Sequence, residues 1–173
     1  MIIIPGADAG KAEYSMAAKA FVDRGYTAAV IEEPIQAGPQ LLFNLSSPRA
    51  LKVFIDKVTA MDAFPADTDQ ILLAGHSFGG STALYYLQGE CPPPLCVPDG
   101  VNADGLPVLK LGEPSDQIKA AGAFATSLTE RSRSFPVVIS FNDALNNNAF
   151  PFLIVNGEFD DKNFRLIDGV KVT

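Results

Sequence analysis

Short apolar runs alternate with amphipathic segments through the first half of the chain. The runs at residues 2–4, 26–32 and 71–74 predict strands, because short continuous apolar runs between turn residues are typical of buried strands. Between them, residues 11–24 and 48–61 repeat apolar side chains at helical spacing and predict two helices, the first with Tyr14 and Phe21 on its apolar face. Ser47 is predicted to cap the second helix and Pro48 to occupy its first position, because serine and proline are favoured at these places.

The second half continues the alternation less regularly. Residues 81–88 predict a helix that ends at Gly89, and apolar runs predict strands at 120–126, 152–157 and, more briefly, 137–140. Residues 89–117 are rich in Pro, Gly and Asp, which indicates a loop excursion over the surface or, alternatively, a lid or pocket wall. Strands alternating with helices predict an α/β fold: a mostly parallel, twisted sheet with helices on both faces.

Length and composition indicate a single globular domain. The 173 residues suffice for one domain with a core and are too few for two ordinary ones. A net charge of −7 disfavours nucleic acid or an anionic membrane as a partner. No apolar run approaches the roughly 20 residues that a membrane-spanning helix needs. We therefore expect residues 1–173 to form one soluble domain without a membrane span.

The two cysteines, Cys91 and Cys96, leave two interpretations open. They are either free thiols in a surface loop or a short disulfide that stiffens the chain after the third helix. A disulfide would favour an oxidising or extracytoplasmic compartment; the sequence otherwise leaves the compartment undetermined. A zinc site is not predicted, because no further cysteine and no nearby histidine pair could complete it.

The strand predicted at 71–74 runs directly into the sequence Gly75-His76-Ser77-Phe78-Gly79. This G-x-S-x-G pattern between a strand and a helix predicts a nucleophile elbow, a sharp turn that presents the serine hydroxyl. Gly75 and Gly79 would remove side chains that collide in such a turn. The alternative is an ordinary serine in a glycine-rich turn.

A nucleophilic serine needs donors for the oxyanion, an acid and a base. The N–H of Phe78 is the expected first donor, and the loop after the first strand offers the N–H of Ala7 as the second. Asp160 follows the apolar strand at 152–157 and is the expected acid, with Asp161 as second choice.

The base is missing from this set. His76 is the only histidine of the chain, and at an elbow the side chain before the nucleophile points away from it. We therefore expect His76 to hold the turn rather than to take the serine proton. No histidine follows Asp160, where the chain order of nucleophile, acid and base would place it.

Together, these motifs resemble those of the α/β-hydrolase superfamily, in particular its dienelactone hydrolase, chlorophyllase and cutinase-like polyesterase branch. That branch shares a Pro-Gly oxyanion loop, a Gly-His-Ser-x-Gly-Gly elbow and a Gly-x-x-Asp acid loop, which are found here at residues 5–7, 75–80 and 157–160. The resemblance implies hydrolysis of a small-molecule carboxylic ester, or a similar acyl bond, through an acyl-serine intermediate and without a metal or organic cofactor.

The chain departs from the family pattern at both ends. The strands expected before Ile2 and the final strand–helix portion with the histidine are absent, so we expect the sheet to be incomplete at both edges. A fragment, or a domain completed by a partner chain, would account for both departures. As it stands, the chain is expected to turn over weakly or not at all. The alternative is a non-catalytic pseudoenzyme that serves as a binding or structural subunit.

Overall fold

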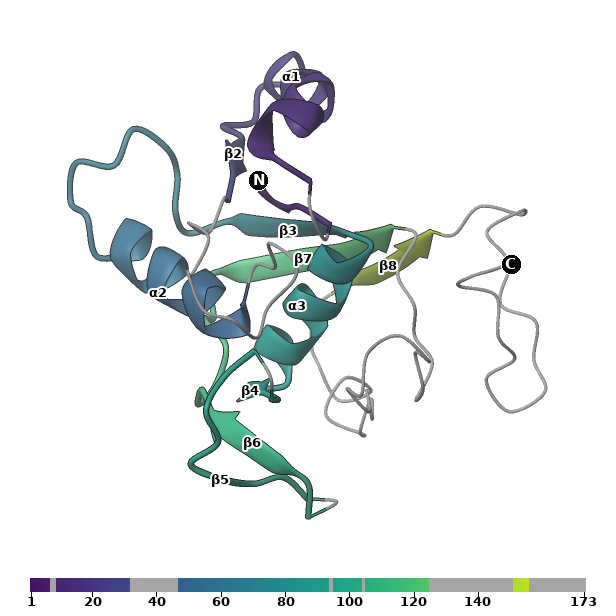
Figure 1. The fold of residues 1–173 in the computed structure, drawn as a ribbon. Coiled ribbons are helices and arrows are strands. Elements are labelled where there is room, and N and C mark those ends of the chain that lie inside the picture. The colour runs from purple at the N-terminus through teal and green to yellow at the C-terminus, as the bar shows by residue number, and fades with distance from the viewer. Residues whose placement is uncertain (7–8, 32–46, 94, 104, 125–150, 156–173) are drawn as a thin grey trace.

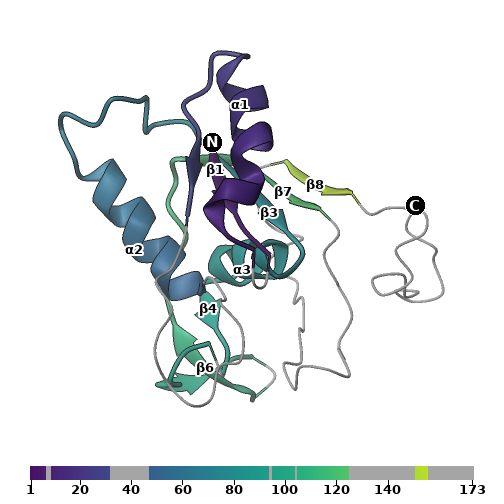
Figure 2. The same ribbon diagram turned by 45° about the horizontal axis from the view of Figure 1, so that its top comes forward.

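The computed structural model describes residues 1–6, 9–31, 47–93, 95–103, 105–124 and 151–155 (Figure 1). Its main sheet has five strands in the order β2-β1-β3-β7-β8, and every neighbouring pair is parallel. Figure 2 labels β1, β3, β7 and β8 of this sheet, which follow one another in that order. The strands are β1 (Ile2–Ile4), β2 (Ala29–Val30), β3 (Ile71–His76), β7 (Ile118–Phe124) and β8 (Phe152–Val155). The predicted α/β fold with a parallel sheet is confirmed.

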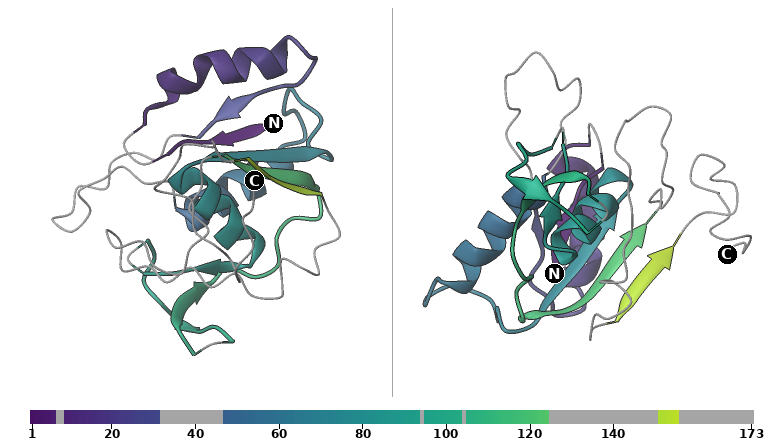
Figure 3. Two further views of the ribbon diagram at one scale, coloured as in Figure 1. Left: turned by 90° about the vertical axis from the view of Figure 1, so that its right-hand side faces the viewer. Right: turned by 90° about the horizontal axis from the view of Figure 1, so that it is seen from below.

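Helices cover both faces of this sheet. The 3-10 helix η1 (Lys11–Tyr14) and α1 (Ser15–Val22) lie on one face, and α2 (Pro48–Thr59) and α3 (Phe78–Leu87) lie on the other (Figure 3). The strand order explains this division. The connection from β1 to β2 steps one way along the sheet, whereas those from β2 to β3 and from β3 to β7 step the other way. Because such crossovers are right-handed, the two directions place their helices on opposite faces.

The element bounds differ from the predicted ones in a few places. The segment predicted as one helix at 11–24 divides into η1 and α1, and the strand predicted at 26–32 is hydrogen-bonded as a strand only over Ala29–Val30. The third helix begins at Phe78, three residues before the predicted start, because Gly79 and Gly80 are themselves helical. The strand predicted at 137–140 lies outside the described residues.

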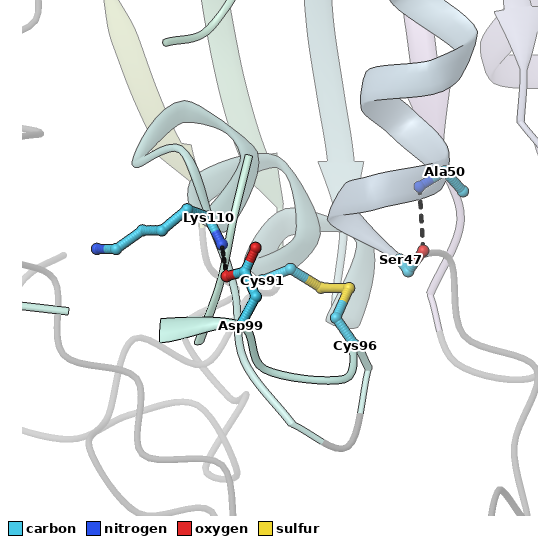
Figure 4. The surroundings of a disulfide bond; sticks show 6 residues. All are labelled: Ser47, Ala50, Cys91, Cys96, Asp99 and Lys110. Carbon is cyan, nitrogen blue, oxygen red and sulfur yellow. Dashed lines mark hydrogen bonds between the residues drawn. A yellow bond between two sulfur atoms is a disulfide. The ribbon is translucent and has the colours of Figure 1, made fainter. Parts of the chain in front are cut away.

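The core lies between the sheet and the α2–α3 layer. α2 starts at the predicted cap, where the Ser47 hydroxyl accepts a hydrogen bond from the Ala50 N–H at 3.1 Å (Figure 4). Almost every residue of α3 is buried, as expected of a helix that is apolar all round. The core cluster among the described residues consists of Ile2, Ile4, Leu51, Ile55, Ile71, Leu73, Ala83, Tyr86, Leu87, Ile118 and Ala121.

The excursion at 89–117 contains more regular structure than its composition predicts. Three short strands, β4 (Glu90–Cys91), β6 (Pro107–Lys110) and β5 (Gly100–Val101), form an antiparallel sheet in that order. Cys91 and Cys96 form a disulfide beside it, which settles the choice between thiols and a disulfide in this structure (Figure 4). The excursion begins at the C-terminal end of α3, about 15 Å along the helix from Ser77. Its role as a lid or pocket wall stays a prediction.

Candidate active site where two neighbouring strands end

The residues after β1 and β3 meet at the carboxyl edge of the sheet. The two strands are parallel neighbours, with Ile4 opposite Gly75, so Gly6 and Ser77 leave the sheet at the same level. From there the chain turns toward β2 on one side and, through α3, toward β7 on the other. In open α/β sheets this change of direction opens a crevice in which ligands bind. The fold therefore brings Pro5 and Gly6 together with the elbow motif at a favourable place for a site.

Ser77 has a strained backbone. Its φ is 51° and its ψ is −119°, and it is the sole non-glycine residue with a positive φ in the described part of the chain. Its N–H donates to the Phe124 carbonyl at 2.8 Å and its carbonyl accepts from the Gly80 N–H at 3.0 Å. β3 ends at His76 and α3 begins at Phe78, so Ser77 alone makes the change from strand to helix. The sharp turn that the motif predicts is present, and strain of this kind clusters at functional sites.

The glycines on either side permit this turn. A β-carbon on Gly75 would overlap the carbonyl of Gly79, and a β-carbon on Gly79 would overlap the carbonyls of Ile4 and Pro5. The overlapped atoms belong to the backbone and cannot rotate away. The start of α3 therefore packs directly onto the end of β1, and glycine is required at both positions for close backbone approach rather than for a positive φ.

The predicted oxyanion donors are placed in part. Phe78 is the first residue of α3, and the first N–H groups of a helix have no acceptor within the helix and favour negative charge. Ala7 lies outside the described residues. Its neighbour Gly6 packs against the elbow: a β-carbon there would be 3.1 Å from His76 Nδ1 and 3.2 Å from Ser77 Cβ. The loop after β1 thus reaches Ser77, as a second donor would require.

His76 contacts Tyr14, on a different element. Its Nδ1 lies 2.8 Å from the Tyr14 hydroxyl, and that hydroxyl also accepts a hydrogen bond from the Gly6 N–H at 2.8 Å. This arrangement agrees with the expectation that His76 holds the turn. The contribution of Tyr14 was not predicted, because its spacing assigns it to the apolar face of a helix and nothing in the local sequence indicates a partner 62 residues away.

The expected acids, Asp160 and Asp161, lie outside the described residues. The register of the sheet nevertheless defines where the chain leaves β8. Val155 is opposite Phe124 of β7, which is opposite His76 of β3, so β8 ends at the same edge as the elbow and two strands away from it. The carboxylate role of Asp160 stays a prediction.

The cavity found in the described part of the chain lies away from the elbow. A cavity of about 270 Å³ lies between the amino ends of β1 and β3. It is lined among others by Met1, Tyr26, Phe54 and Gln70, and is therefore at the opposite edge of the sheet from Ser77.

Across the described residues, no cluster of three or more His, Cys, Asp or Glu side chains could hold a metal ion. Within that same part of the chain, no helix has the length and apolar character to cross a membrane.

Comparison with known proteins supports the fold. Neither a protein-family profile nor a curated protein matches the sequence. Among solved structures, a lipase/esterase from Lactobacillus plantarum is similar to this chain, with a TM-score of 0.60 and 20% sequence identity. The similarity covers 94% of this chain and 66% of that one, so the chain spans just under two thirds of the neighbour's length. At this identity the likeness establishes a shared α/β fold and nothing finer.

Proposed function

We propose that the protein is a serine hydrolase that cleaves a small-molecule carboxylic ester, or a similar acyl bond, through an acyl-serine intermediate. The strained backbone of Ser77 at the junction of β3 and α3 carries this proposal. Two further observations support it: Gly6 packs against the elbow, and the chain shares its fold with a lipase/esterase.

In the proposed reaction the Ser77 hydroxyl oxygen attacks the carbonyl carbon of the substrate while a base takes its proton. The negative charge that develops on the carbonyl oxygen would be held by the N–H groups of Phe78 and Ala7. The alcohol then leaves with a proton, and water hydrolyses the acyl-serine to regenerate the hydroxyl. Asp160, or Asp161 in its place, would orient the base. No step requires a metal or an organic cofactor.

The base is not identified within this chain. His76 is its only histidine, and its Nδ1 is engaged by Tyr14. We therefore expect the 173-residue polypeptide to react slowly, with the elbow and oxyanion donors in place but without efficient proton transfer. General-base catalysis contributes typically 10²–10⁴-fold, so the expected loss is about that large.

A fluorophosphonate reagent with mass-spectrometric mapping tests the proposal. We expect slow labelling at Ser77, no labelling at this position in Ser77→Ala, and unchanged labelling in Ser15→Ala, an exposed serine at the start of α1. Added imidazole should accelerate labelling by supplying an external base. Equal labelling of wild type and Ser77→Ala would overturn the proposal. Rapid labelling without imidazole would instead refute the expected weakness of this chain.

The second candidate function is a non-catalytic binding or structural subunit. The engagement of the sole histidine by Tyr14 favours it. A folded wild-type chain that resists the reagent, even with saturating imidazole, would support this function. Labelling at Ser77 that imidazole accelerates would contradict it.

A further inference from the structure

The Tyr14 hydroxyl connects two loops that the sheet itself does not join. The chain leaves β1 through Gly6 and leaves β3 through His76, and the hydroxyl lies 2.8 Å from the Gly6 nitrogen and 2.8 Å from His76 Nδ1. The Tyr14 and His76 rings also lie close together, with their centroids 5.9 Å apart and their planes tilted by 57°. One side chain thus contacts both of the segments that lie beside Ser77 at the carboxyl edge of the sheet.

The element that carries Tyr14 has little other packing to hold it. Neither η1 nor α1 contains a buried residue, and Tyr14 itself is half-buried. Apolar burial therefore contributes little to placing this segment. Directed hydrogen bonds at the Tyr14 hydroxyl are correspondingly important for its position, and for that of the Gly6 loop to which it is bonded.

The direction of the Gly6–Tyr14 hydrogen bond is fixed, and that of the Tyr14–His76 contact follows from the tautomer of the histidine. The Gly6 N–H can only donate, so the phenolic oxygen accepts from it and still has its own hydrogen to donate. His76 Nδ1 is within reach of that hydrogen, and it accepts the hydrogen bond when the proton of the neutral imidazole is on Nε2. The hydrogen bonds then run in one direction, from Gly6 through Tyr14 to His76.

We propose that Tyr14 is a positioning residue, whose hydroxyl holds the Gly6 loop against the Ser77 elbow and thereby sets the distance between the nucleophile and the oxyanion donor that this loop supplies. This inference rests on the proposed serine hydrolase function. It assigns Tyr14 no contact with the substrate. Because reacting groups must be placed to within about 1 Å, loss of the hydroxyl is expected to slow the reaction at Ser77 by about tenfold.

The test compares Tyr14→Phe with wild type and with Tyr26→Phe as a matched control. Phenylalanine keeps the ring contact with His76 and removes only the hydroxyl, whereas Tyr26 lies at the far edge of the sheet beside Phe21. Phosphonate labelling is measured at several reagent concentrations with imidazole present. We expect Tyr14→Phe to lower the maximal labelling rate about tenfold and to leave the half-saturating concentration unchanged. Tyr26→Phe should match wild type within about twofold.

A second readout is independent of activity. The chain has one histidine, so ¹⁵N NMR at alkaline pH reports the tautomer of His76 without ambiguity. Wild type should show an unprotonated Nδ1 that accepts a hydrogen bond, and Tyr14→Phe should shift that resonance and speed hydrogen exchange of the Gly6 amide. A general loss of stability would not produce these local signals in a protein that remains folded.

Each outcome decides a separate point. Equal maximal rates for wild type and Tyr14→Phe overturn the positioning role, and an unshifted His76 resonance overturns the hydrogen bond. If wild-type Ser77 does not react at all, the proposed function fails. The His76 and Gly6 signals alone then decide whether the Tyr14–His76 hydrogen bond exists.

A second pair of variants serves if Tyr14→Phe does not fold. His76→Asn keeps a polar acceptor near the Nδ1 position, and His76→Leu removes it. Similar rates for those two variants overturn the proposal as well.

Discussion

Two adjacent tyrosines of α3 are expected to respond in opposite ways to the same substitution. Tyr85 and Tyr86 are both buried, with exposed fractions of 3% and 1%. The Tyr85 hydroxyl has no hydrogen-bond partner among the described residues. The Tyr86 hydroxyl accepts a hydrogen bond from the Ser115 N–H at 3.0 Å. Replacing each tyrosine with phenylalanine removes one oxygen from nearly the same depth in the core, so the two variants control for each other.

The magnitudes follow from the state of each hydroxyl. A buried polar group without a partner costs roughly 1–3 kcal/mol, part of which Tyr85→Phe recovers. We expect that variant to leave the free energy of unfolding unchanged or to raise it by up to about 1 kcal/mol. Tyr86→Phe loses a hydrogen bond and leaves the Ser115 N–H without its acceptor, which should lower the free energy of unfolding by about 1–2 kcal/mol. The two variants should therefore differ by about 2 kcal/mol.

Urea unfolding followed by circular dichroism measures this difference. The slope of the transition should be the same for both variants, because neither changes the surface exposed on unfolding. Tyr26→Phe, at a position that is 46% exposed, should lie within about 0.5 kcal/mol of wild type. Equal losses at both positions, or a larger loss at Tyr85, would refute the reasoning.

Three further predictions concern the elbow, the disulfide and pH. Gly79→Ala should lower the free energy of unfolding by at least about 3 kcal/mol in a urea titration, because its β-carbon meets backbone, whereas Gly100→Ala, with open space around it, should change it by less than about 0.5 kcal/mol. Replacing Cys91 and Cys96 together by serine should cost about 2 kcal/mol in the same assay, as expected for so short a loop, and no loss would show that the disulfide does not form. Burial raises the pKa of Tyr85, and the Glu90 charge raises it further; burial also raises that of Tyr86. The contribution of these two raised pKa values to the free energy of unfolding should be fully present below about pH 10, the pKa of tyrosine in the unfolded chain. It should decline as the pH rises from there toward the pKa values in the folded state. Urea titrations at increasing pH should show a flatter decline in Tyr85→Phe than in wild type.

Local patterns in the sequence determined much of the architecture. Ser47 and Pro48 mark the start of α2, because a cap depends on side chains and N–H groups only three residues apart. The G-x-S-x-G motif likewise predicts the turn at Ser77, since Gly75 permits the close approach of backbone within that turn. The contact of Gly79 with the end of β1 depends instead on the pairing of β1 with β3. Apolar runs predict the strands of the main sheet, because strands of a parallel sheet with helices on both faces are mostly apolar. Ala7 and Asp160 stay predictions, because both lie outside the described residues.

The tertiary structure alone decided which distant residues meet. Ile4 lies opposite Gly75 only because β1 pairs with β3, and this pairing brings Gly6 to Ser77. The spacing of apolar residues assigns Tyr14 to the apolar face of a helix, yet its hydroxyl forms a hydrogen bond with His76, 62 residues away. The small sheet at 89–117 also depends on pairing between β4 and β6, whose residues show little strand pattern of their own. Spacing along the chain records neighbours within a turn or a strand, whereas contacts between elements depend on strand order and on the handedness of the connections between strands.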